Sequence, residues 1–227
     1  MSLDNQTLEV GSKLLRDIEI LSEARLFYEK ELLPTVKKEI DRTIYGWAES
    51  NAWIDDREDK KTNSAAKYIT GHWVAPNEWM AQPFQGNEKL KDTQKWIGWF
   101  KLDFFDNGAP SDLDLARLLG NDAVDIGLLV DYYPMSFANV DIGAANTKFG
   151  EELKKYGFDV AYTYKKGRFA RKIKIDLDNT ILAWESGSWA RALQPLVGAL
   201  EDAKSSVAIF NGIFRAWQHV NKDKFPL

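Results

Sequence analysis

The sequence predicts an α+β domain in which a central mixed β-sheet of about five strands lies between N-terminal and C-terminal helices. Three observations lead to this fold class. Apolar residues recur every three or four positions over residues 5–53, a spacing typical of amphipathic helices. Residues 65–177 contain instead short apolar and aromatic runs bounded by turn residues, as strands do. From Trp189 the helical spacing returns.

The chain of 227 residues is expected to form a single domain, residues 1–227. Its 44% apolar and 28% charged residues match the averages for soluble globular proteins. No linker between two domains is evident. The domain would comprise a helical layer at 1–53, a sheet-bearing core at 65–177 and C-terminal helices at 189–221.

The helical layer is expected to cover the core with its apolar face. Within it, Ser22 is a candidate N-cap between two helices. Pro34 should kink or restart the second helix because proline has no amide hydrogen. The polar residues 55–64 then predict a loop.

The strands are expected at 68–74, 94–105, 124–133, 158–165 and 168–177. Short helices at 111–120 and 147–156 would connect them, each stopped by a glycine. The last two strands predict a β-hairpin that turns at Lys166-Gly167. Trp96 and Trp99 lie an odd number of residues apart, so the strand at 94–105 is aromatic on both faces and is expected inside the sheet.

Composition excludes several functional classes. There is no cysteine, which excludes disulfides, thiolate zinc sites and cysteine nucleophiles and is in keeping with a cytoplasmic location. No apolar run approaches the ~20 residues of a membrane helix, so no membrane partner is expected. The net charge of −4 argues against generic nucleic-acid binding but leaves room for a local basic groove.

Standard motifs for phosphate or metal binding are missing. The chain has neither a P-loop nor a dinucleotide-binding glycine fingerprint. Its two histidines, His72 and His219, lack a second ligand residue at the spacing of a helical metal site. His72 is therefore interpreted as a structural histidine whose ring nitrogens are satisfied within the fold.

Aspartates are concentrated in the middle of the chain. Between Lys101 and Gly150 there are eight aspartates and no glutamate. Asp103 and Asp125 lie in or beside predicted core strands, where an unpaired carboxylate is costly. Asp103 would either pair with Lys101, two residues away on the same strand face, or coordinate a divalent cation.

A basic stretch follows, with six basic residues and no acid from Lys165 to Lys174. A twisted two-stranded ribbon with this charge is suited to a nucleic-acid groove, but lysines also protect an edge strand from aggregation. Both interpretations stay open. The first predicts DNA contacts from five residues: Lys165, Lys166, Arg168, Arg171 and Lys172.

The segment 96–131 resembles the middle of type II restriction endonucleases of the Bgl type. The resemblance rests on Trp99–Asp106, on Asp112-Leu113-Asp114-Leu115 and on Val124–Val130, which contains an internal glycine. It implies a restriction-endonuclease-like fold of the PD-(D/E)xK class, with a mixed sheet flanked by helices. It also implies Mg²⁺-dependent hydrolysis of DNA phosphodiesters.

In that family, metal-binding acids stand on the strand just before the tryptophan, where this chain has Trp96, Ile97 and Gly98. The resemblance therefore implies that other residues replace them. Lys101 and Asp103 would be catalytic, and Asp103, Asp106 and Asp125 would bind Mg²⁺. The alternative function is a non-catalytic binding or structural protein, and a homodimer is left open.

Overall fold

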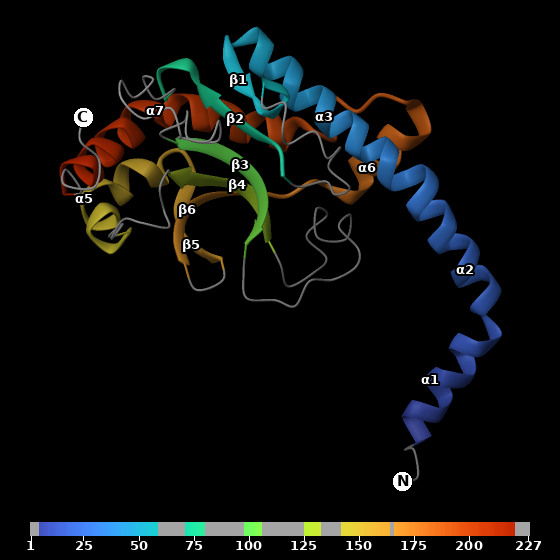
Figure 1. Ribbon diagram of the computed structural model, residues 1–227. Coiled ribbons are helices and arrows are strands. Elements are labelled where there is room, and N and C mark those ends of the chain that lie inside the picture. Colours follow the sequence, from blue (N-terminus) through green and yellow to red (C-terminus); the bar gives the residue numbers. More distant parts are fainter. Residues whose placement is uncertain are drawn as a thin grey trace, which may run out of the picture. The chain divides into compact units, whose positions relative to one another are not determined.

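A computed structural model of the protein describes residues 5–58, 71–79, 98–105, 125–132, 142–163 and 166–220 (Figure 1). The chain divides into two compact units, Met1–Glu39 and Ile40–Leu227. The larger unit contains all the described strands. The sheet-bearing core expected at 65–177 therefore lies within the larger unit.

The smaller unit is helical. It contains α1 (Asn5–Arg16), α2 (Ile18–Phe27), a π-helical turn (Tyr28–Leu32) and the start of α3 (Leu33–Ser50). The first two helices separate at Asp17. The N-cap predicted at Ser22 is wrong, because the Ser22 hydroxyl donates a hydrogen bond to the Ile18 carbonyl inside α2 (2.8 Å). Helix α3 does restart at Pro34, which is its second residue.

The sheet of the larger unit has the strand order β1-β2-β3-β4-β6-β5. Its strands are β1 (Trp53–Asp55), β2 (Trp73–Pro76), β3 (Gly98–Phe105), β4 (Asp125–Tyr132), β5 (Phe158–Thr163) and β6 (Lys166–Ile173). The α+β class is confirmed. The sheet has six described strands instead of five, and each pair of neighbours is antiparallel, so the prediction of a mixed sheet is wrong.

The connection between β4 and β5 explains the antiparallel sheet. It includes α5 (Ile142–Lys154), a crossover helix of the kind that often precedes a parallel neighbour. Here β5 does not pair with β4. The hairpin returns through β6, which occupies the position between them and is antiparallel to both.

Several sequence-based boundaries differ from the structure, among them those of β1 and of the hairpin. Strand β1 lies where the helical pattern was extended to Trp53, because three residues are too few to show an alternating pattern. The predicted hairpin is confirmed, but Lys166 and Gly167 lie within β6 and pair with Thr163 and Tyr162, so they are not the turn. The helix predicted at 111–120 lies outside the described residues.

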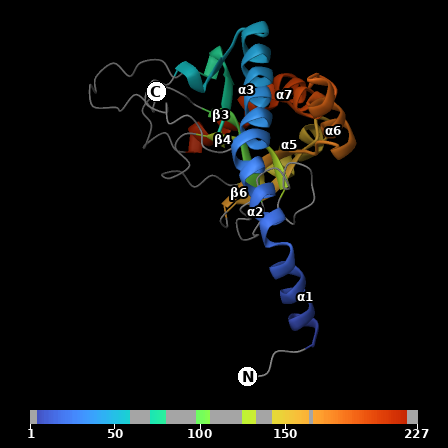
Figure 2. The same ribbon diagram turned by 90° about the vertical axis from the view of Figure 1, so that its right-hand side faces the viewer.

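Among the described residues, the larger unit also contains the helices α6 (Leu177–Ser186) and α7 (Gln194–Val220). Helix α6 begins after Asp176, whose carboxylate accepts a hydrogen bond from the Asn179 amide (2.9 Å). Helix α7 packs along one face of the sheet, over β4 and β6 (Figure 1). Seen from the side, it crosses behind α3 (Figure 2). The indole of Trp47 in α3 donates a hydrogen bond to Glu201 of α7 (2.6 Å). In the described part of the chain, no helix combines the length and apolar character that crossing a membrane requires.

The core lies between α7 and the sheet face that it covers. Strand β3 is internal, as expected, and its residues alternate between the two faces. Phe100 and Leu102 are buried on the covered face. The ring of Phe210, from α7, contacts aromatic rings of three strands and of the segment after β2: Trp79, Phe100, Phe158 and Phe169. These buried rings form the centre of the core.

Gly98 is required by close packing at the start of β3. A Cβ atom at this position would lie 2.7 Å from the Phe214 ring and 3.1 Å from the Asp131 carbonyl oxygen. We expect Gly98→Ala to lower the free energy of unfolding by about 1–3 kcal/mol through overpacking. Gly46 of α3 has nothing within 4 Å of such a Cβ. Gly46→Ala should therefore stabilise the protein by about 0.5–1 kcal/mol.

Urea unfolding of the two glycine variants tests the expected destabilisation and the expected stabilisation in one experiment. Opposite shifts of the transition midpoint, with unchanged slope, are the expected result. A Gly98→Ala variant as stable as the wild type would contradict the tight packing between β3 and α7.

Candidate functional site

The sheet face opposite α7 carries ion pairs from three neighbouring strands, and we call it the ion-pair face. It is defined by Lys101 and Asp103 of β3, Asp131 of β4 and Arg168 of β6. The Lys101 Nζ atom lies 2.6 Å from Asp103 Oδ2, and both side chains are partly exposed (31% and 25%). Of the two alternatives that the sequence left open for Asp103, the structure shows the pair with Lys101.

Asp131 is the buried member of the ion-pair face. Its Oδ1 atom lies 2.7 Å from Nη1 of Arg168. Burial raises the pKa of Asp131. The positive charges of Arg168 and Lys101 act against this rise, and Asp103 adds to it by repulsion. Two acids and two bases thus influence one another across β3, β4 and β6.

Strand register determines how the predicted metal ligands are placed. Asp103 pairs with Gly127, and Asp125 stands two residues before this glycine. Asp103 and Asp125 are thus diagonal neighbours in the β3–β4 ladder, with Cα atoms roughly 7–8 Å apart. Asp131 is four positions from Gly127, about 13 Å along the strand. Asp106 and the side chain of Asp125 lie outside the described residues.

This register suits a small divalent-cation site. Mg²⁺ prefers carboxylate oxygens and is often held by one or two of them, together with water and substrate phosphate. In the described part of the chain, no group of three or more His, Cys, Asp or Glu residues is placed to hold a metal. Asp103 and Asp125 supply at most two protein carboxylates, so a cation bound there would need its remaining ligands from water or substrate oxygens.

The predicted DNA-contacting residues do not share one face. Arg168 lies on the ion-pair face, whereas Arg171 lies an odd number of residues away and projects from the opposite face. There its Nε atom donates a hydrogen bond to Asp202 of α7 (3.0 Å). Lys172 shares the face of Arg168 by strand alternation. Lys165 and the side chain of Lys166 are outside the described part of the hairpin.

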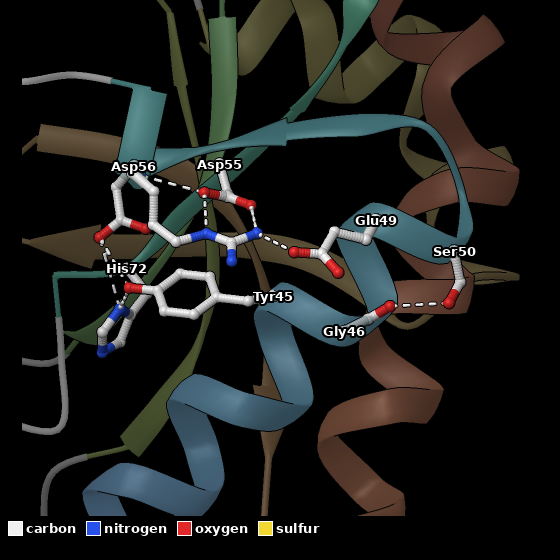
Figure 3. Close-up of polar contacts among 8 residues, drawn as sticks. Tyr45, Gly46, Glu49, Ser50, Asp55, Asp56 and His72 are labelled. Carbon is white, nitrogen blue, oxygen red and sulfur yellow. Dashed lines mark hydrogen bonds and ion pairs between the residues drawn. The ribbon is translucent and has the colours of Figure 1, made fainter.

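A second cluster of charges surrounds His72. Its imidazole is only 3% exposed and lies just before β2. Nε2 is 2.9 Å from Asp41 Oδ1, and Nδ1 is 3.4 Å from Asp56 Oδ2. The Tyr45 hydroxyl is 3.2 Å from the same Nδ1 atom (Figure 3). Both ring nitrogens therefore have polar neighbours.

The charge of His72 depends on these neighbours. Burial by itself lowers the pKa of His72, because it disfavours the charged imidazolium. Hydrogen-bond and charge interactions with Asp41 and Asp56 act against burial and outweigh it, so the pKa rises to about 9. The structure thus favours a protonated His72 at neutral pH.

Arg57 connects residues next to the His72 cluster. Its guanidinium makes two hydrogen bonds with Asp55 (2.9 and 2.7 Å) and one with Glu49 (2.8 Å) (Figure 3). The guanidinium carbon also lies 4.3 Å from the centre of the Tyr45 ring. Asp55 and Asp56 were predicted in a loop, but Asp55 ends β1 and Asp56 begins a short 3-10 helix.

The His72 cluster is suited to holding elements together. A general base needs a ring nitrogen that can reach a substrate, whereas this imidazole is buried with both nitrogens engaged. It joins α3, the segment after β1 and the segment before β2. The interpretation of His72 as a structural histidine agrees with this geometry.

The sequence contained one sign of this cluster. Asp41, Tyr45 and Glu49 follow one another at intervals of four, so they line one side of α3. Their partners are 8 to 31 residues away in the chain, as for Arg57 with Glu49 and His72 with Asp41. Local spacing does not reveal such partners.

Comparison with known proteins adds no relative. No family model matches the chain, and neither the curated proteins nor the solved structures include a match to it. Its function is therefore inferred from its own residues.

Proposed function

We propose that the protein is a restriction-endonuclease-like, nucleic-acid-processing domain that hydrolyses DNA phosphodiesters with Mg²⁺. The observation that carries the proposal is the diagonal register of Asp103 and Asp125 beside the Lys101 ammonium group. The resemblance of residues 96–131 to Bgl-type endonucleases gives further support. Because the described strands are all antiparallel, the proposal rests on this site and not on the sheet topology.

The residues would divide the chemistry as follows. Asp103 and Asp125 would hold the cation from adjacent strands, with Asp106 as a further carboxylate. Bound Mg²⁺ polarises a phosphoryl oxygen and lowers the pKa of a bound water. Lys101, now 2.6 Å from Asp103, would turn to the phosphate and neutralise its developing charge. The cations of the hairpin, Lys165, Lys166, Arg168 and Lys172, would contact the DNA backbone.

Metal binding is tested most directly at Asp103. Mg²⁺ or Mn²⁺ at a hundred times its dissociation constant should stabilise the wild type by about 2.7 kcal/mol. Asp103→Asn should abolish both this stabilisation and metal-dependent cleavage of duplex DNA. The matched control is Asp159→Asn on β5, because Asp159 is exposed and its carboxylate accepts a hydrogen bond only from the adjacent Val160 amide among the described contacts.

Thermal unfolding with and without metal, followed by a plasmid cleavage assay, measures both effects. The proposal is contradicted if the metal leaves the wild-type unfolding temperature unchanged. It is also contradicted if Asp103→Asn cleaves DNA as fast as Asp159→Asn does.

The second candidate is a non-catalytic binding or structural protein. Internal neutralisation of charge favours it, since Lys101, Arg168 and Arg171 each form an ion pair with an aspartate of the fold. DNA binding without cleavage, or neither activity, in the presence of Mg²⁺ would select this candidate.

A further inference from the structure

Helix α2 exposes its large apolar side chains. Five of its ten residues are large and apolar, and none of the ten is buried: Ile18, Ile20, Leu21, Leu26 and Phe27. A helix this short is marginal in water on its own and normally gains its stability from packing. A helix that is apolar around its circumference is normally covered. This composition indicates a surface that is buried against another molecule.

Around the junction of α1 and α2, four exposed residues stand symmetrically about a midpoint. The midpoint lies between Asp17 and Ile18. At equal distances from that midpoint stand Leu15 and Ile20, which are also the most exposed large apolar residues (75% and 68%). Arg16 and Glu19 are opposite in charge and equally distant from the midpoint. Lys13 and Glu23 are also opposite in charge, and their distances from the midpoint differ by one residue.

We propose that these helices form an antiparallel homodimer, in which α1 of one copy packs against α2 of a second copy. This orientation brings Leu15 against Ile20 of the partner subunit and Arg16 against Glu19 of the partner subunit. Two-fold symmetry makes each contact occur twice. A parallel pairing in register would instead place Arg16 beside Arg16 and Glu19 beside Glu19.

The exposed apolar area is that of a weak dimer. Six exposed side chains contribute to it: Val10, Leu15, Ile18, Ile20, Leu21 and Leu26. At about 100 Å² each, they offer on the order of 600 Å² per subunit, against the ~800 Å² of a standard interface. Ile18 and Leu21 lie on the side of α2 opposite Glu19 and Ile20, so a contact between two helices buries only part of this area. The buried total stays below the ~1,200 Å² of stable complexes, which predicts a weak dimer that forms at high protein concentration.

The charges of this segment favour a protein partner over a lipid surface. Residues 5–32 carry six acidic and four basic side chains. Helices that lie on membranes have a polar face rich in lysine and arginine, which anionic lipids attract. A mixture of both signs arranged about a midpoint suits pairing with a second copy.

Charge reversal in the full-length chain tests both the interface and its direction. Sedimentation equilibrium from micromolar to hundreds of micromolar protein should show a monomer–dimer equilibrium. Arg16→Glu should raise the dimer dissociation constant roughly tenfold, because it places two like-charged pairs in the dimer. Arg16→Glu/Glu19→Arg should restore the wild-type constant. Leu15→Ser/Ile20→Ser should weaken the dimer by roughly a hundredfold or more.

Circular dichroism of each variant verifies that the rest of the fold is intact. The proposal is overturned if the wild type stays monomeric over the whole concentration range. It is equally overturned if the double charge reversal dimerises no better than Arg16→Glu. A monomer that binds vesicles containing anionic lipid, and loses this binding in Leu15→Ser/Ile20→Ser, would replace it with a membrane-surface role.

Discussion

The free energy of unfolding is expected to fall by about 3 kcal/mol as the pH rises from about 6.5 to about 9. The fold raises the pKa of His72 from 6.5 to about 9, so the folded state holds this proton more tightly than the unfolded chain does. The stabilisation is fully present below the unfolded pKa. It is lost as the pH passes through the folded pKa, where the imidazolium between Asp41 and Asp56 becomes neutral.

Urea unfolding at pH values from 6 to 9 measures this dependence. His72→Gln should be less stable than the wild type at pH 6 by about 3 kcal/mol, and the difference should shrink toward pH 9. Tyr45→Phe is the matched control, because it removes a neighbouring hydroxyl but leaves Asp41 and Asp56 in place. It should retain most of the pH dependence.

Nuclear magnetic resonance provides an independent measurement. The sequence contains two histidines, so His72→Gln assigns the imidazole signal of the other. The His72 signal is expected to titrate near pH 9. A midpoint close to 6.5, or an equal pH dependence in His72→Gln and wild type, would contradict the charged His72 cluster.

Replacing Phe210 by alanine is expected to lower the free energy of unfolding by about 3–5 kcal/mol. Phe210 is fully buried and its ring contacts five other aromatic rings: Trp79, Phe100, Phe158, Phe169 and Phe214. These come from the segments around β2, β3, β5 and β6 and from α7 itself. Removing the ring leaves a cavity among rigid neighbours that cannot close around it.

Two comparisons define the Phe210 experiment. Phe210→Leu should lose less stability than Phe210→Ala, because leucine fills part of the space. Leu182→Ala on α6 removes a side chain that is about half exposed and should change stability by no more than about 0.5 kcal/mol. If Phe210→Ala costs as little as Leu182→Ala, the centre of the core is elsewhere.

The elements that could be predicted are those with a long, periodic pattern. The internal strand β3, the strand β4 and the C-terminal helix α7 each span eight or more residues, so the aromatic or apolar runs of the strands and the period of the helix are visible in the sequence. The short strand β1 was missed, and the start of β6 was misplaced, because a few residues do not distinguish a strand from its surroundings. The antiparallel sheet was missed because strand order depends on which strands meet in space.

The ion pairs of the candidate site also differ in whether the sequence could predict them. The Lys101–Asp103 pair was predictable, because residues two apart in a strand share a face. The pairing of Arg168 with Asp131 and of Arg171 with Asp202 was not, because each joins residues more than thirty positions apart. The opposite placement of the two arginines follows from their odd spacing within β6.

The amino-acid sequence by itself determined the class of the fold, its internal strand and the ion pair on β3, since each follows from patterns or close spacing along the chain. Only the tertiary structure decided that β6 lies between β4 and β5, that Asp103 and Asp125 are diagonal neighbours, and that His72 lies between Asp41 and Asp56. These features require residues far apart in the chain to meet, and long-range contacts are selected by the burial and charge balance of the whole fold.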